Sequence, residues 1–355
     1  MSVQLVRGSA TTRCLAIASL VLGLGFLAWL PFMVGSFRVF QLTLVLIWAV
    51  SVMGLNLLVG YSGQISIGHN ALFAVGAYTA AILMHRYDTN VVLCLVAAAT
   101  TSGLVGLLVG IPALRLQGLH LAIVTLALAM ATTAVLQRFG SLTGGAAGLS
   151  VPRLRPPSWL PIEDEQYVYL ISLVVAVVMF VIARNLTSSA FGRALVAIKD
   201  NPLAAAAMGI DSRIYKALTF AMSGVFAGVA GVLYVLAIRY VSPEAFPLLL
   251  SVTFLAAIAV GGLGTISGAI VGAAFVQFVP QFASSVNDSL ATLLYGVVLI
   301  VVMIVMPTGI VGLAKRLLGR VVTITDPPVP PVAGDDEPFT ESPPAELPEP
   351  VNASS

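Results

Sequence analysis

Ten long apolar segments dominate this chain, and none of them contains Asp, Glu, Lys or Arg. They cover residues 15–34, 39–59, 69–84, 91–112, 119–137, 167–183, 217–238, 247–261, 265–283 and 290–306. A helix of roughly 20 apolar residues crosses the hydrocarbon core of a bilayer, and helices satisfy their own backbone hydrogen bonds there. The pattern therefore predicts an all-α integral membrane protein with about ten transmembrane helices.

The overall composition agrees with this prediction. Hydrophobic residues make up 59% of the chain and charged residues 9%, whereas soluble domains carry roughly 25% charged residues. We therefore expect a multi-pass protein of the cell membrane (inner or plasma membrane), surrounded by lipid. The two cysteines and three scattered histidines show neither a disulfide framework nor metal-ligand spacing. No metal site, no cofactor and no nucleic-acid partner are expected.

Basic residues are unevenly divided between the two sides of such a bundle. Ten spans place both termini on one side, which would carry 11 of the 17 basic residues, whereas the opposite side would carry 6. The first set is Arg7, Arg13, Arg115, Arg184, Arg193, Lys199, Arg213, Lys216, Lys315, Arg316 and Arg320. Because cytoplasmic loops are enriched in Lys and Arg, we expect both termini to be cytoplasmic.

The composition changes abruptly after Arg320. Residues 321–355 are rich in Pro and acidic side chains and almost free of bulky apolar ones, so they cannot bury a core. We expect a transmembrane domain over 1–320, with a helical cytoplasmic segment at 185–216, followed by a disordered cytoplasmic tail over 321–355.

One polar stretch, GYSGQISIGHN at 60–70, interrupts the apolar pattern. Its polar side chains are Tyr61, Ser62, Gln64, Ser66, His69 and Asn70. The glycines at 60, 63 and 68 make a continuous helix unfavourable, and alternation places Ser62, Gln64 and Ser66 on one face of an extended segment. Irregular backbone at membrane depth survives only when it is buried in protein or lines water. The stretch predicts an interrupted, re-entrant hairpin whose polar side chains line a pathway.

A second stretch, GGLGTIS at 261–267, shares the pattern G-x-x-G-x-I-S with the first. Its candidate residues are Gly261, Gly262, Gly264, Thr265 and Ser267. The adjoining segments, 69–84 and 247–261, are the two shortest in the chain, and paired short, Gly-interrupted segments indicate a transport site. An ordinary cytoplasmic turn explains this second stretch equally well.

The spans contain no ionisable Asp, Glu, Lys or Arg of the kind on which ion-coupled carriers depend. No lysine follows glycine and precedes Ser or Thr, so the chain has no phosphate-binding loop for ATP. It is therefore expected to be a passive pathway or to be driven by a separate motor.

The basic segment between 184 and 216 predicts two short helices. In the first, Phe191, Leu195 and Ile198 form one apolar face, while Arg193 and Lys199 point elsewhere. In the second, Asn201 is the expected N-cap and Pro202 the first residue, with Gly209 at the C-terminal stop. Its small alanines, Ala205 among them, suit docking into another protein, although an amphipathic helix on lipid headgroups fits the basic residues too.

Four stretches together resemble the LivM type of branched-chain amino acid permease, the membrane subunit of ABC importers. They are LNLLVGYSGQISIGHNALFAVGAYTAAIL, SLTGGAAGLS, FGRALVAIKDNPLAAAAMGID and AVGGLGTISG, and the resemblance spans roughly residues 38–313. It implies a second related permease subunit, two cytoplasmic ATPase subunits that hydrolyse ATP, and an extracytoplasmic solute-binding protein. It also implies that the segment holding Arg193, Lys199, Asp200, Asn201, Pro202, Ala205 and Gly209 docks on the ATPase.

Three alternatives remain open. The substrate of such an importer would be a branched-chain or related amino acid, or else urea or a short amide. A channel or facilitator without a motor is the second alternative. A membrane enzyme is disfavoured, because the spans have no charged residue and no suggestive nucleophile–base pair.

Overall fold

The structure is a computed structural model that describes residues 5–6, 21–113, 116, 118–158, 160–286, 291–306, 308–321 and 324–325. Eight helices of this part of the chain are long and apolar enough to cross a membrane, and a shorter apolar helix covers Val21–Phe32. The chain is thus an all-α integral membrane protein. The tail expected to be disordered lies outside the described residues, apart from Val321, Ile324 and Thr325.

The long helices follow the predicted segments closely. They are α2 (Ser36–Asn56), α3 (His69–Tyr87), α4 (Val91–Ala113), α5 (Leu119–Arg138), α7 (Asp164–Ser188), α10 (Ser212–Ile238), α11 (Leu248–Gly261), α12 (Ile266–Val286) and α13 (Ala291–Val305). A π-helical turn, η2 (Leu57–Tyr61), continues α2. With the Val21–Phe32 helix, these elements correspond to all ten apolar segments.

Shorter elements lie between the long helices. They are η1 (Leu30–Phe32), α6 (Gly140–Thr143), η3 (Gly145–Ala147), α8 (Ala190–Asp200), α9 (Pro202–Ala207), η4 (Pro243–Ala245) and α14 (Gly309–Val321). Two-residue strands pair antiparallel as β2 (Leu149–Ser150) with β3 (Tyr240–Val241), and parallel as β1 (Leu5–Val6) with β4 (Ile324–Thr325). None of these pairs forms an extended sheet.

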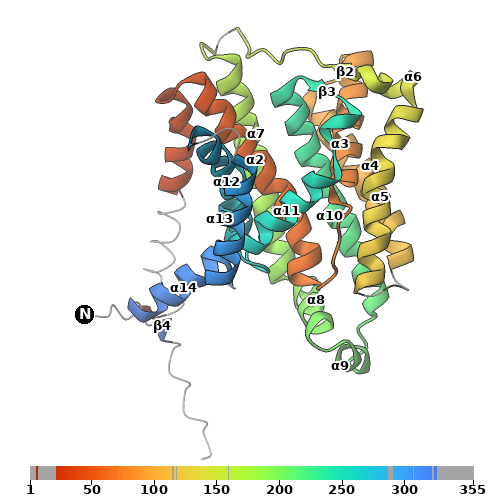
Figure 1. The fold of residues 1–355 in the computed structure, drawn as a ribbon, viewed down its shortest axis with the longest axis vertical. Coiled ribbons are helices and arrows are strands. Elements are labelled where there is room, and N and C mark those ends of the chain that lie inside the picture. Colours follow the sequence, from red (N-terminus) through yellow and green to blue (C-terminus); the bar gives the residue numbers. More distant parts are fainter. Residues whose placement is uncertain are drawn as a thin grey trace, which may run out of the picture.

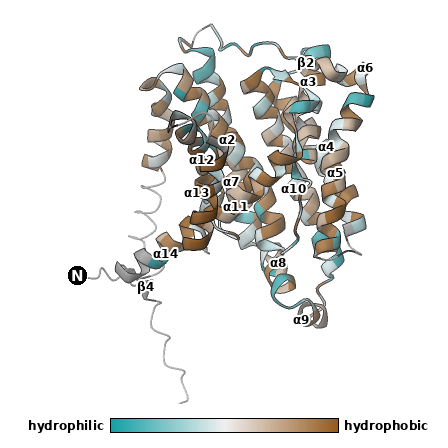
Figure 2. Ribbon diagram, in the orientation of Figure 1, coloured by the Kyte–Doolittle hydropathy of each residue, from teal (hydrophilic) through white to brown (hydrophobic). Residues whose placement is uncertain are grey.

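The long helices stand side by side, and the short elements gather at the two ends (Figure 1). α8 and α9 project from one end, while α6, β2 and β3 lie at the other. Hydrophobic residues cover the middle of the bundle, and hydrophilic residues concentrate towards both ends (Figure 2). This distribution is the one that a bilayer requires of a spanning bundle.

α10 occupies the centre of the bundle and packs against α2, α3 and α4. Glycines and small residues make these crossings close. A Cβ on Gly231 would lie 2.5 Å from the carbonyl oxygen of Phe73, and one on Gly106 would lie 2.5 Å from that of Phe220. Small residues bring helix backbones together where lipid provides no hydrophobic drive, so these glycines form a packing seam.

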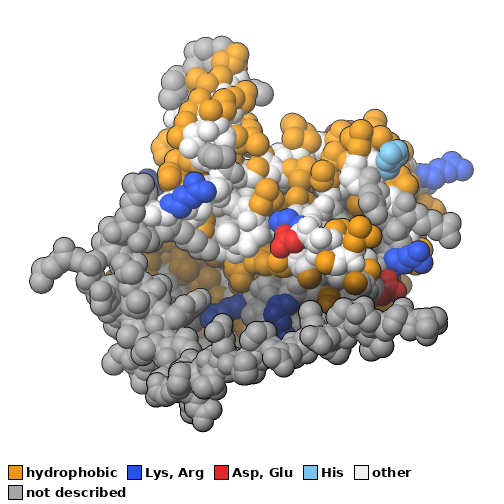
Figure 3. Space-filling model, turned by 90° about the horizontal axis from the view of Figure 1, so that it is seen from below, with side chains coloured by type: hydrophobic (Ala, Val, Ile, Leu, Met, Phe, Trp, Pro, Cys, Tyr) orange, Lys and Arg blue, Asp and Glu red, His pale blue; other side chains and the backbone are white. Residues whose placement is uncertain are grey.

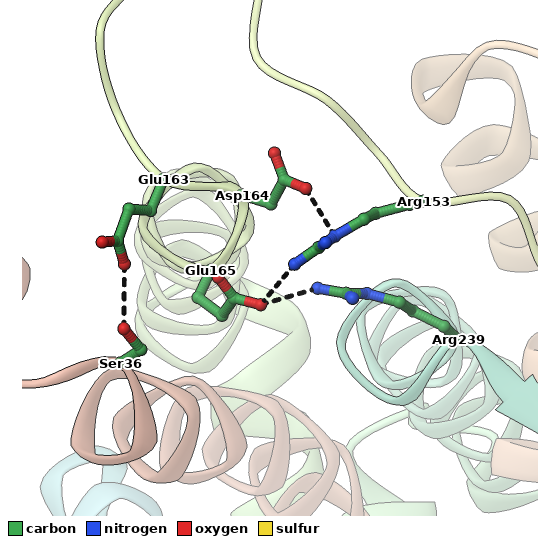
Figure 4. A network of polar contacts seen from close by, with 6 residues as sticks. All are labelled: Ser36, Arg153, Glu163, Asp164, Glu165 and Arg239. Carbon is green, nitrogen blue, oxygen red and sulfur yellow. Dashed lines mark hydrogen bonds and ion pairs between the residues drawn. The ribbon is translucent and has the colours of Figure 1, made fainter.

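The end of the bundle opposite α8 carries a polar network (Figure 4). Arg153 pairs with Asp164 at 2.5 Å and with Glu165 at 2.9 Å, and Arg239 also contacts Glu165, at 3.0 Å. The Ser36 hydroxyl donates to the Glu163 carboxylate at 2.8 Å. The network joins the N-termini of α2 and α7 to the C-terminus of α10. These side chains are partly exposed, so each pair adds only about 0–1 kcal/mol.

The orientation of the bundle remains a prediction that thiol labelling tests. α7 has 25 residues, so its ends lie roughly 37 Å apart, more than the hydrocarbon thickness. In a background without Cys14 and Cys94, single cysteines at Ser158, before α7, and at Ser188, in its last turn, should react with an impermeant reagent from opposite sides. Ser158 is expected to react from outside; labelling of both positions from outside would contradict cytoplasmic termini.

Candidate functional site

The first polar stretch follows the end of α2 as an irregular segment over residues 62–68, which begins with a turn at Ser62 and Gly63. Helical structure persists through Gly60 and ends at Tyr61. Beyond it the side chains alternate as predicted: Ser62, Gln64 and Ser66 are 4%, 5% and 2% exposed, whereas Ile65 is 45% exposed. The prediction that these three side chains share one face is therefore confirmed. This face is turned towards the interior of the protein.

Hydrogen bonds hold this irregular segment in place. The Ser62 hydroxyl donates to the carbonyl of Leu58 at 2.9 Å, and the Gln64 amide nitrogen donates to the Ser62 hydroxyl at 2.5 Å. The backbone N–H of Ile67 donates to the Thr125 hydroxyl of α5 at 3.0 Å. The buried Oε1 atom of Gln64 has no protein partner within the described residues.

His69 and Asn70 begin α3 and are fully buried. The His69 Nε2 atom lies 2.9 Å from the carbonyl oxygen of Ser51 in α2. The Asn70 amide donates to the Phe246 carbonyl at 3.0 Å and accepts a hydrogen bond from Ser251 of α11 at 2.9 Å. These two side chains fasten the start of α3 to α2 and to the start of α11, and in the single chain they face protein.

The second polar stretch forms the turn between α11 and α12. Gly262 and Gly264 have φ values of 121° and 69°, which favour glycine. The Thr265 hydroxyl donates to the carbonyl of Gly262 at 2.8 Å. Gly261 packs against α12, and Ser267 is exposed in its first turn. The turn is tight and well bonded.

Asn56 joins the two polar stretches. Its Oδ1 atom accepts from the N–H of Gly264 at 2.9 Å, and its Nδ2 atom donates to the carbonyl of Thr265 at 2.9 Å. A Cβ on Gly60 would lie 2.5 Å from the Gly264 nitrogen. The two copies of G-x-x-G-x-I-S are therefore neighbours in space. Asn56 was not among the residues predicted from the sequence. The signal that could have identified it is a polar amide within the apolar segment 39–59.

The basic segment forms the two predicted helices. Asn201 caps α9 by accepting from the N–H groups of Leu203 and Ala204, and Pro202 is its first residue. Gly209 has a φ of 80° and ends the turn. Leu195 and Ile198 are buried, whereas Arg193, Lys199 and Asp200 are exposed. Seen from this end, the surface shows more Lys and Arg than acidic side chains (Figure 3).

The structure corrects one candidate in this segment. Ala205 is only 3% exposed, because its side chain packs against its own chain. In the single chain it therefore offers little surface to another protein. Leu203 and Met208, which flank the alanines, are 84% and 82% exposed instead. The apolar tip of α9 therefore consists of these two larger side chains.

A bundle of apolar helices, interrupted by two polar turns that meet beside a projecting basic segment, defines a membrane transport permease. The chain belongs to the family described as "Branched-chain amino acid transport system / permease component", whose family model matches residues 37–306. It is a multi-pass protein of the inner membrane. No solved structure gives a significant match.

Curated relatives include two permease proteins of one bacterium, named LivM and LivH. The chain is 31% identical over 314 residues to the high-affinity branched-chain amino acid transport system permease protein LivM of Escherichia coli K12, covering 82% of this chain and 73% of that protein. It is 27% identical over 281 residues to LivH of the same organism, covering 75% and 91%. BraD of Pseudomonas aeruginosa is 26% identical over 282 residues, covering 75% and 91%.

Proposed function

We propose that the chain forms half of a translocation pathway for branched-chain or related amino acids. LivM and LivH, two permeases named for one transport system, both match this chain. This similarity supports a second, related permease as its partner. Two cytoplasmic ATPase subunits would supply the energy, and an extracytoplasmic solute-binding protein would deliver the substrate.

The observation that carries this proposal is the meeting of the two polar turns beside α8. A cavity of about 180 Å³ lies between the first polar stretch and the α8–α9 segment, lined by Ser62 and Gln64 on one side and by Ile198, Lys199 and Pro202 on the other. In the proposed cycle, ATP binding displaces α8 and α9. The polar face of residues 62–66 then moves away from its packing partners and lines the path, as alternating access requires.

Substitution of the polar face tests the pathway. Gln64→Leu and Ser66→Leu should each lower leucine uptake by roughly tenfold, equivalent to about 1.4 kcal/mol of barrier, because a water-filled path needs polar lining. Ile65→Leu, between them and on the exposed face, should transport normally. Uptake of radiolabelled leucine is measured at matched membrane abundance, with urea as the competing substrate.

Two outcomes would count against the proposal. Full uptake by both Leu variants would leave this stretch with a purely structural role. Uptake of radiolabelled urea in the absence of any uptake of radiolabelled leucine would assign the permease to small amides.

A further inference from the structure

Lys199, in the last turn of α8, reaches a transmembrane helix that lies 139 residues earlier in the chain. Its Nζ atom donates to the carbonyl oxygen of Gly60 at 2.7 Å. Gly60 belongs to the π-helical turn that ends α2, where backbone carbonyls lack helical partners. A cation at a helix C-terminus is favoured both by this hydrogen bond and by the helix dipole. A side chain of the cytoplasmic segment therefore caps α2.

The stem of Lys199 also lies against the polar turn. A Cβ on Gly63 would lie 3.1 Å from the Lys199 Cγ atom. α8 is held against the chain by its buried Leu195 and Ile198 side chains. Apolar packing of this kind is not directional, whereas the hydrogen bond to Gly60 fixes one atom of α8 to one atom of α2.

The connection continues from Gly60 to the second polar turn. Asn56, one turn earlier in α2, is fully buried and bonds to both Gly264 and Thr265. At Gly60 itself a side chain would collide with Asn56 and Gly264. Three groups in series, Lys199, Gly60 and Asn56, thus link the cytoplasmic helix to both polar stretches.

From this geometry we infer that Lys199 is a positioning residue that transmits the displacement of α8 to both polar turns. The inference rests on the proposed function, since it assigns the step between the ATPase and the pathway. Without the ammonium group, α8 would still pack and still dock. The movement of α8 would then no longer displace the end of α2. The turn at 261–265, which is bonded to α2 through Asn56, would not move with α8.

The test separates coupling from assembly in the complete transporter, reconstituted with its ATPase subunits. Lys199→Met should co-purify with the ATPase and hydrolyse ATP, yet transport roughly tenfold fewer substrate molecules per ATP, a factor typical of coupling between sites. Lys199→Arg, which keeps the charge and the donor, should recover most of the ratio. Arg184→Met is the matched control: this exposed basic residue at the same end has no side-chain hydrogen bond within the described residues.

A double variant tests whether the three groups act in series. Asn56→Leu should lower the ratio without touching α8, and adding Lys199→Met should lower it little further, because the two residues would share one route. Fully additive losses at matched abundance would overturn the inference. If Asn56→Leu does not accumulate, the comparison of Met with Arg at position 199 still decides.

The inference and the proposed function fail in different ways. An unchanged ratio of transport to hydrolysis in Lys199→Met overturns the inference alone, and so does loss of ATPase binding by that variant. Absence of ATPase binding by the unmodified chain overturns the proposed function.

Discussion

Leu203→Asp or Met208→Asp is expected to abolish ATP-driven uptake while leaving the permease folded in the membrane. Both side chains are more than four-fifths exposed at the tip of α9, so neither supports the fold of the single chain. In a docked complex they would be buried, and a carboxylate buried in an apolar contact is strongly disfavoured. Loss of an apolar anchor at an interface costs about 2 kcal/mol or more, so ATPase co-purification should fall by roughly thirtyfold or more.

Leu142→Asp is the matched control for this experiment. Leu142 is also an exposed leucine, but it lies in α6 at the opposite end of the bundle. It should retain the ATPase. If α9 instead lies on lipid headgroups, an added carboxylate would weaken lipid contact and leave the ATPase bound. Normal co-purification by both tip variants would therefore remove α9 from the docking surface.

The second large effect is expected at the packing seam. Gly231→Val should remove most of the folded protein from the membrane, because a Cβ there would lie 2.5 Å from the Phe73 carbonyl and 2.6 Å from the Ala77 nitrogen. Both neighbours are backbone atoms of α3, so α3 and α10 would have to separate. Overpacking of a tight core costs about 1–3 kcal/mol or more.

Gly296→Val is the matched control, because it introduces the same side chain into an apolar helix without a clash with a neighbouring helix. Gly296 also lies in an apolar helix, α13, but has no neighbouring atom within 4 Å of its Cβ position. Detergent-extracted protein should elute as a monodisperse peak for this variant and mostly aggregate for Gly231→Val. Equal elution profiles would show that α3 and α10 tolerate separation.

Most of the fold could be predicted from the sequence, because the signals were local. Uncharged apolar runs indicate spans wherever they occur. Asn201, Pro202 and Gly209 mark helix ends through backbone geometry alone, and all three act as predicted. The alternation at 62–66 likewise predicts a shared face from chain geometry.

The direction of each face could not be predicted, since it depends on what packs there. Ala205 lies in a run of four alanines that the sequence does not distinguish from one another. Within α9, it is the one alanine whose side chain is buried. The bonds from Asn56 to the second turn join residues more than 200 positions apart. Such contacts follow from the arrangement of whole helices, which single-sequence patterns do not contain.

The inward orientation of Ser62, Gln64 and Ser66 has a consequence for the cell before assembly is complete. A newly inserted copy, still alone in the bilayer, turns these groups away from lipid and presents Ile65 outward. Along this stretch the single subunit therefore provides no continuous polar pathway for ions. We therefore expect that a copy without its proposed partner does not dissipate the proton-motive force through this stretch.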